Sequence, residues 1–107
     1  MLVKDFKPCT DWRKLNGTSL KGCVNISYAL LVELFGVPHN DGDGHKTDAE
    51  WDLVSKDGTV ITIYNYKDGK NYCGHSGLAV EDITYWHVGG KENRALRLID
   101  ACINEYA

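Results

Sequence analysis

In residues 49–66 a stretch of alternating apolar and polar residues is followed by a run rich in apolar side chains, and both patterns are typical of strands. Trp51 and Leu53 alternate with two carboxylates, and residues 59–66 are rich in β-branched and aromatic side chains. Asp57–Gly58 separates the two runs, and this dipeptide tolerates the positive φ angles of a tight turn. The pattern predicts a central β-hairpin. Because a lone hairpin is unstable in water, its apolar face must be covered by other elements.

Two segments repeat apolar residues every three or four positions, which is the spacing of an amphipathic helix. Before the first segment Ser27 can supply an N-cap, and after it Gly36 and Pro38 are typical of a helix end. The second segment runs from Lys91 toward the C-terminus. The two apolar faces consist of Tyr28, Leu31, Val32 and Phe35 in the first helix and of Ala95, Ile99, Cys102, Ile103 and Tyr106 in the second.

Two further segments, 22–26 and 83–88, have the composition of strands, and Gly89–Gly90 is expected to end the latter. Together these elements predict an α+β fold, in which a small, mostly antiparallel sheet of three to four strands with a central hairpin is packed by two helices. Residues 1–18 are expected to form an N-terminal arm, and residues 19–107 a single α+β domain.

Composition narrows the class of protein. The chain has 107 residues, of which 43% are hydrophobic and 25% charged, as in an ordinary folded domain. No apolar run approaches the roughly 18 residues of a membrane span, and the first residues lack the apolar stretch of a secretory signal, so we expect no membrane partner and a cytoplasmic protein. The net charge of −3 argues against binding to duplex nucleic acid.

Neither metal nor cofactor chemistry is indicated by the spacing of ligand-type residues. Residues 39–46 are rich in Asp, Asn and Gly, but an EF-hand register fails from both Asp41 and Asp43, and these residues are also ordinary in turns. The cysteines form no Cys-x-x-Cys pair, and we expect reduced thiols. They are Cys9, Cys23, Cys73 and Cys102.

Signatures of catalysis are equally weak. Cys73 and His75 are close in sequence, but no nucleophile elbow or Cys–His signature surrounds them, and no phosphate-binding Walker loop occurs. We therefore expect a protein that is not an enzyme. A small hydrolase using Cys73 or His75 is the weakest of the hypotheses considered.

The first candidate for ligand binding is the end of the last strand, where aromatic residues precede Gly89–Gly90, Lys91 and a helix. Glycines let a ligand approach the backbone, and amides at a helix N-terminus attract anions. Lys91 and Arg94 would add positive charge. The simpler interpretation is a tight turn, with Trp86 in the core.

The second candidate is a set of aromatic residues that consists of Trp51, Tyr64, Tyr66, Tyr72 and Trp86. Tyr64 and Tyr66 share one face of a strand because side chains alternate, and Asn65 points the other way. If that face is open, the rings can stack on flat ligands such as bases. The alternative is one buried tyrosine and one at the rim.

Several short motifs resemble a family of small bacteriophage-encoded proteins. The most specific are Phe35–Gly36–Val37–Pro38 and Trp86–His87–Val88–Gly89–Gly90, and the resemblance extends over roughly residues 19–92. Some members of this family are sponges, which sequester the cyclic oligonucleotide signals of bacterial anti-phage defence, such as those of CBASS systems, without cleaving them. The resemblance implies a phage anti-defence protein that acts in the host cytoplasm.

The resulting hypothesis is a homo-oligomeric sponge for a cyclic di- or trinucleotide. Tyr64, Tyr66 and Trp86 are expected to stack on bases. Lys46, Lys91 and Arg94, with the amides of Gly89 and Gly90, are expected to meet phosphates. Asn65, Thr47 and His87 are expected to read base edges or ribose. The alternative is a phage protein that inhibits a host protein directly, through the acidic side chains of Asp41, Asp43, Asp48, Glu50 and Asp52.

Overall fold

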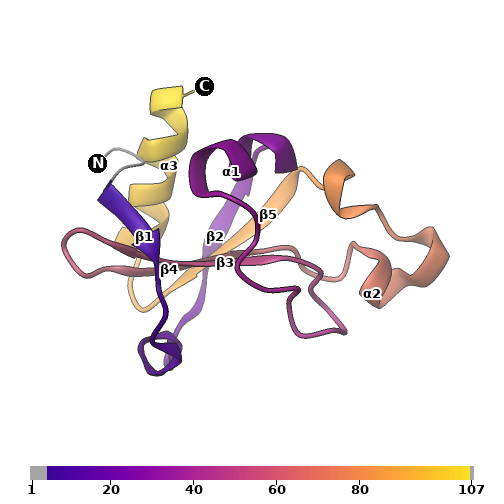
Figure 1. Ribbon diagram of the computed structural model, residues 1–107, viewed down its shortest axis with the longest axis horizontal. Helices are drawn as coiled ribbons and strands as arrows, with labels where there is room; N and C mark the ends of the chain where they lie inside the picture. Colours follow the sequence, from indigo (N-terminus) through magenta and orange to yellow (C-terminus); the bar gives the residue numbers. More distant parts are fainter. Residues whose placement is uncertain (1–4, 107) are drawn as a thin grey trace.

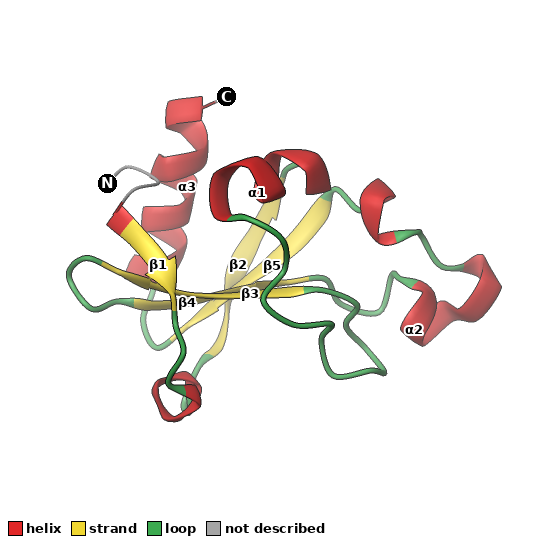
Figure 2. Ribbon diagram, in the orientation of Figure 1, coloured by secondary structure: helices red, strands yellow, loops and turns green. Residues whose placement is uncertain are grey.

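The computed structural model describes residues 5–106 and shows an α+β fold built on an antiparallel sheet of five strands (Figure 1). The strand order across the sheet is β1-β3-β4-β5-β2. The strands are β1 (Phe6–Pro8), β2 (Ser19–Asn25), β3 (Glu50–Ser55), β4 (Val60–Tyr64) and β5 (Tyr85–Gly90). The helices are α1 (Tyr28–Phe35), α2 (Lys70–Cys73) and α3 (Arg94–Tyr106), with 3-10 turns η2 (Trp12–Leu15), η3 (Gly74–Ser76) and η4 (Val80–Asp82) (Figure 2).

The central hairpin is confirmed. β3 and β4 pair in antiparallel register from Glu50 opposite Tyr64 to Val54 opposite Val60. Gly58 in the connecting turn has a φ of 88°, a conformation that L side chains rarely adopt. The turn at Asp57–Gly58 and the two strands beside it therefore lie where the sequence predicts them.

Helices α1 and α3 cover one face of the sheet (Figure 1). The strands direct Trp51, Ile63 and Trp86 toward them, and all three side chains are fully buried. The two indoles meet edge to face, with ring centroids 5.3 Å apart. Each indole N–H finds a backbone acceptor, since Trp51 Nε1 lies 2.8 Å from the Gly36 oxygen and Trp86 Nε1 lies 3.1 Å from the Ile26 oxygen.

The predicted ends of α1 are also confirmed. The Ser27 hydroxyl accepts a hydrogen bond from the Leu30 amide at 3.1 Å, and Gly36 adopts a φ of 84° at the C-cap. In α3 the predicted apolar stripe is buried at Ala95, Ile99 and Cys102. Both helices thus follow from the spacing and the capping residues read in the sequence.

The expected number of strands, three to four, is wrong because β1 completes the sheet at one edge. Phe6–Pro8 pairs with Leu53–Ser55 of β3, and the Phe6 ring packs edge to face on Phe35 at 5.9 Å. At the other edge β2 pairs with β5. The expected number of helices, two, is exceeded by the short α2. Residues 5–18 of the expected arm are therefore integrated into the fold, and residues 1–4 lie outside the described residues.

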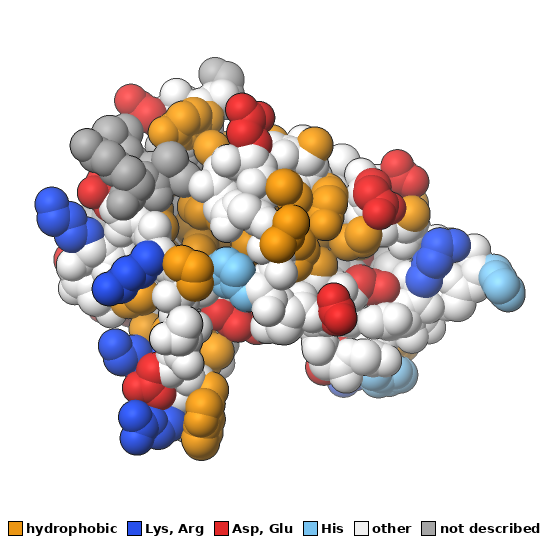
Figure 3. All heavy atoms as spheres, viewed as in Figure 1, with side chains coloured by type: hydrophobic (Ala, Val, Ile, Leu, Met, Phe, Trp, Pro, Cys, Tyr) orange, Lys and Arg blue, Asp and Glu red, His pale blue; other side chains and the backbone are white. Residues whose placement is uncertain are grey.

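The face of the sheet opposite α1 and α3 is called the open face here. Because β1 and β2 lie at opposite edges, the segment that joins them has to cross the sheet, and η2 lies on the open-face side (Figure 1). Lysine and arginine side chains gather over β1, η2 and the β3–β4 turn, at the left of Figure 3. No helix within residues 5–106 combines the length and the apolar character needed to cross a membrane.

Candidate functional site

Aromatic side chains meet on the open face where β4 and β5 lie side by side. His87 is the central ring: Tyr66 stacks on it at 5.3 Å between centroids with an interplanar angle of 26°. Tyr64 and Tyr85 contact the same imidazole edge to face at 5.5 and 5.9 Å. Tyr66 is 41% exposed and Tyr85 50% exposed, so solvent reaches both rings.

Lys67 extends this cluster toward α2. Its ammonium group lies 5.3 Å from the ring centroids of both Tyr66 and Tyr72, which are cation–π distances. Lys67 also has a φ of 61°, and among the described residues other than glycine it alone has a positive φ. Backbone strain of this kind is concentrated at functional sites. We call Tyr64, Tyr66, Tyr72, Tyr85 and His87, together with Lys67, the aromatic surface.

The strand register explains why these side chains meet. His87 lies opposite Tyr64 on β4 and opposite Cys23 on β2. Gly89 follows two residues later on the same face, and a Cβ there would lie 2.4 Å from the Thr62 hydroxyl and 3.4 Å from the Tyr64 ring. The missing side chain therefore makes room for Thr62 and Tyr64 on the open face.

Two carboxyl groups border the aromatic surface. Glu50 lies opposite Tyr64 in the hairpin, and burial, followed by a hydrogen bond with Asp52, raises the pKa of Glu50 to about 8. The pKa of Glu50 thus lies above neutral pH, and Oδ1 of the buried Asp52 has no hydrogen-bond partner among the described residues. Asn40 Nδ2 donates to Asp52 Oδ2 at 3.0 Å. Near neutral pH the pair therefore holds one proton.

Burial and hydrogen bonding shift the pKa values of three of these rings. It lowers the pKa of His87, against the opposing charge of Asp68, so the imidazole is kept neutral. Burial, followed by the negative charge of Glu50, raises the pKa of Tyr64. A hydrogen bond with Cys23 raises that of Tyr85. The aromatic surface is therefore made of neutral rings with Lys67 as its cation.

Asn65, expected to read a base edge, is a structural residue. Its side chain is fully buried, and its amide oxygen accepts from the backbone N–H of Asp48 at 2.7 Å and of Ala49 at 3.2 Å. Its Nδ2 donates to Asp48 Oδ1 at 2.8 Å and to Asp68 Oδ1 at 3.0 Å. These four bonds leave no free group for a ligand and join residues 48–49 to the segment after β4.

Thr47 is likewise used inside its loop, because its hydroxyl accepts from the Asp43 amide at 2.7 Å and donates to Asp43 Oδ1 at 3.2 Å. Asp43 Oδ1 also receives the amides of residues 45–47, and these backbone bonds lower the pKa of Asp43 to about 2. Lys46 is partly buried beside it, and its carbonyl oxygen accepts the Lys67 amide at 2.7 Å. The Asp/Gly-rich loop is thus held by its own hydrogen bonds.

The expected anion cradle at Gly89–Gly90 is wrong. Both glycines lie inside β5, paired with β4 on one side and with β2 on the other, so their backbone belongs to the sheet and not to a helix N-terminus. A Cβ on Gly90 would lie 2.5 Å from the Cβ of Ala95, which shows that this glycine lets α3 approach the sheet. The stacking role expected for Trp86 is also wrong, because its ring is 0% exposed and points away from His87, into the core.

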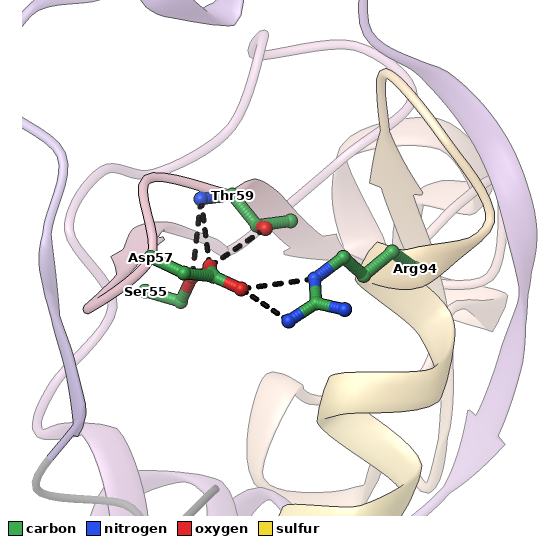
Figure 4. Close-up of polar contacts among 4 residues, drawn as sticks. All are labelled: Ser55, Asp57, Thr59 and Arg94. Carbon is green, nitrogen blue, oxygen red and sulfur yellow. Dashed lines mark hydrogen bonds and ion pairs between the residues drawn. The ribbon is translucent and has the colours of Figure 1, made fainter.

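Arg94 is paired within the protein. Its guanidinium contacts Asp57 Oδ2, with Nε at 2.9 Å, and so ties α3 to the hairpin turn (Figure 4). Asp57 is also bonded to Ser55 and Thr59, and these bonds, the Ser55 hydroxyl first, lower its pKa. Lys91 is exposed beyond the end of β5. Neither cation belongs to the aromatic surface.

The structure thus brings together Tyr64, Tyr66 and His87 from the expected ligand-binding residues. Tyr72, from the expected aromatic set, and Tyr85, from the segment before Gly89–Gly90, join them although neither was given a role, and Lys67 is new. Tyr85 could have been found from the period of two, since it shares a face with His87. Lys67 could not, because its place between two rings depends on the turn after β4. The described residues hold no cluster of three or more His, Cys, Asp or Glu side chains suited to a metal ion.

Comparisons with known proteins add no relative. No family model matches the chain, and no curated protein or solved structure matches it either. The resemblance to phage-encoded proteins therefore stays a prediction that rests on the short motifs alone.

Proposed function

We propose that the protein binds a cyclic di- or trinucleotide on the aromatic surface and sequesters it without cleavage, as a phage anti-defence sponge. The observation that carries the proposal is the exposed stack of Tyr66 on His87, with Lys67 beside it. Bases stack on such rings with little dependence on sequence, at about 1–3 kcal/mol per base. Lys67 supplies a cation for a phosphate. In this proposal Lys67 takes the phosphate-binding role that the sequence analysis gave to Lys91 and Arg94.

The shape of this surface favours a site shared by two copies of the chain. The rings lie on an exposed sheet face, and the cavities lined by Lys14 and Lys56 and by Asp48 and Leu78 lie elsewhere. A second copy facing the first would enclose the ligand from both sides, in the way that symmetric oligomers build sites. Light scattering with and without ligand measures this directly.

Calorimetry against a panel of cyclic dinucleotides and trinucleotides tests the proposal. We expect one ligand to bind and to be recovered intact after the protein is denatured. Tyr66→Ala and His87→Ala are each expected to weaken binding about tenfold or more, because each removes one stacking partner. Recovery of a hydrolysed product would overturn the sponge and indicate an enzyme.

Tyr106→Ala is the matched control. Tyr106 lies at the end of α3 and is 46% exposed, close to the 41% of Tyr66, so both substitutions remove a similarly exposed ring. Equal loss of affinity in both variants would show that the aromatic surface is not the site. Unchanged affinity in Tyr106→Ala with a large loss in Tyr66→Ala supports it.

The alternative, an acidic surface that inhibits a host protein, loses much of its support. Asp52 is buried, Asp48 is bonded to Asn65 and to the Asn71 amide, and Glu50 holds a proton near neutral pH. Of the expected acidic side chains, mainly Asp41 and Asp43 remain at the surface.

A further inference from the structure

A group of lysines lines a cavity at the other end of the sheet, away from the aromatic surface. The cavity has a volume of about 400 Å³, which is within the range of small-molecule sites. Lys7 of β1, Lys14 of η2 and Lys56 of the β3–β4 turn line it. Three lysines that are far apart in sequence are therefore brought to one hollow by the crossing of the N-terminal segment.

Two carboxylates close to these lysines in sequence, Asp11 and Asp57, are bound by other partners. Asp11 forms an ion pair with Arg13 at 3.0 Å, and Asp57, adjacent to Lys56, is paired with Arg94 and bonded to Ser55 and Thr59. Within residues 5–106 these are the ion pairs found, and none includes the three lysines. Asp5 also lines the cavity, so three ammonium groups there face one carboxylate.

The other side chains that line the cavity offer a ligand few further contacts. Phe6 is 9% exposed and Val54 is 8% exposed, so neither presents a ring face or a broad apolar surface to a ligand. A lysine ammonium is a compact point charge on a flexible stem, which suits the oxygens of a phosphate group. Because the protein as a whole carries a net charge of −3, this hollow is a local reversal of its charge.

We propose that this lysine cavity is a binding site for a small anion with two or more phosphate groups, separate from the nucleotide site on the aromatic surface. Lys7, Lys14 and Lys56 hold the phosphates, and Gly58, which has no side chain, also lines the cavity. The chemistry is shared by inorganic polyphosphates and by nucleoside polyphosphates.

Isothermal calorimetry with pyrophosphate, tripolyphosphate and ATP tests this site. The titrations are run at about 0.15 M salt, where the attraction between well-separated surface charges is largely screened. We expect tripolyphosphate to bind more tightly than pyrophosphate because it meets more of the lysines. Equal affinities for tripolyphosphate and ATP identify the phosphates alone as the recognised group, whereas tighter binding of ATP identifies a nucleoside polyphosphate. Failure of the wild-type protein to bind any of the three overturns the proposal.

Variants that each remove one positive charge, inside or outside the cavity, locate the site. Lys7→Gln, Lys14→Gln and Lys56→Gln are each expected to weaken tripolyphosphate binding about tenfold, the usual scale of a hydrogen bond to a charged group. Lys21→Gln is the control, because Lys21 lies on β2 at the opposite edge and its ammonium contacts Ser19. Similar losses in Lys21→Gln and the cavity variants would show nonspecific attraction and overturn the site. If one cavity variant has a lowered melting temperature, the other two decide the outcome.

Discussion

At the scale of single residues, Asn65 shows how a polar side chain can look like a ligand-binding group and be structural. It sits between two tyrosines of the expected site, but it is fully buried and all four of its hydrogen bonds go to Asp48, Ala49 and Asp68. Buried polar groups are normally satisfied in this way. The sequence shows that Asn65 points away from Tyr64 and Tyr66, but not what it meets there.

Asn65→Ala is expected to lower the free energy of unfolding by about 2–4 kcal/mol, because it leaves two buried amides and two aspartates without their partner. Urea denaturation followed by tryptophan fluorescence measures the loss. Asn71→Ala is the control, since the exposed Asn71 gives up one side-chain bond, to the Thr47 oxygen at 3.0 Å. A loss at position 65 no larger than that at position 71 would contradict the structural role.

Glu50 gives a second prediction at this scale. Its pKa is about 8 in the folded protein and 4.5 as the ordinary value, so between these values the folded state holds a proton that the unfolded state has lost. Stability therefore falls as the pH rises from about 5 to 8. We expect this contribution to be about 1–2 kcal/mol, less than the full shift implies, because Glu50 is partly exposed and solvent screens it.

Glu50→Gln removes the titrating group and keeps a donor for Asp52. The variant should match the wild type near pH 5 and exceed it in melting temperature near pH 8. His87 has a lowered pKa and contributes the opposite slope, but it is present in both proteins and cancels in the difference. Parallel pH profiles for the two proteins would show that Glu50 does not hold the proton.

At the scale of elements, the local signals predict well and the non-local ones do not. The hairpin and α1 carry their turn and capping residues within their own segments, so their positions follow from composition and spacing. The pairing of β1 with β3, across more than forty residues, leaves no such local mark. Gly89–Gly90 was expected to break a strand, because glycine usually does. In the structure it continues β5, with one glycine making space on each face.

The alternation of side chains along β5 explains which residues reach the aromatic surface. Trp86 and His87 are adjacent, and alternation sends one to the core and the other to the open face. The sequence shows that the two side chains point to opposite faces of the sheet. It does not show which of them is buried, because that depends on where α1 and α3 pack.

Gly90→Ala tests the close approach of α3 to the sheet. The added Cβ would lie 2.5 Å from that of Ala95, and we expect a loss of about 1–3 kcal/mol in the free energy of unfolding, as for other overpacked sites. In Gly90→Ala/Ala95→Gly the clash is removed, so the double variant should be less destabilised than the sum of the single variants. Strict additivity in chemical denaturation would rule out this contact as the cause.

At the scale of the whole molecule, the N-terminal segment connects the two edges of the sheet on the open-face side. The aromatic surface and the lysine cavity lie at different ends of the sheet. The lysine cavity depends on this segment, because Lys7 belongs to β1 and Lys14 to η2. The segment expected to be an arm is thus part of the sheet and of the proposed anion site.

A chain that begins at Ser19 is therefore expected to be strongly destabilised or unable to fold. It loses the edge strand on β3, the Phe6–Phe35 contact and part of the cover of the open face.

Phe6→Ala measures the contribution of ring packing alone. It removes a ring that is 9% exposed and should lower the free energy of unfolding by about 3 kcal/mol. The shortened chain should lose clearly more than that, because it also exposes the unpaired amides and carbonyls of β3. Urea midpoints and amide hydrogen exchange on β3 measure both effects. A shortened chain with the wild-type midpoint and protected β3 amides would show that residues 19–107 fold alone, and that the N-terminal segment serves only the lysine cavity.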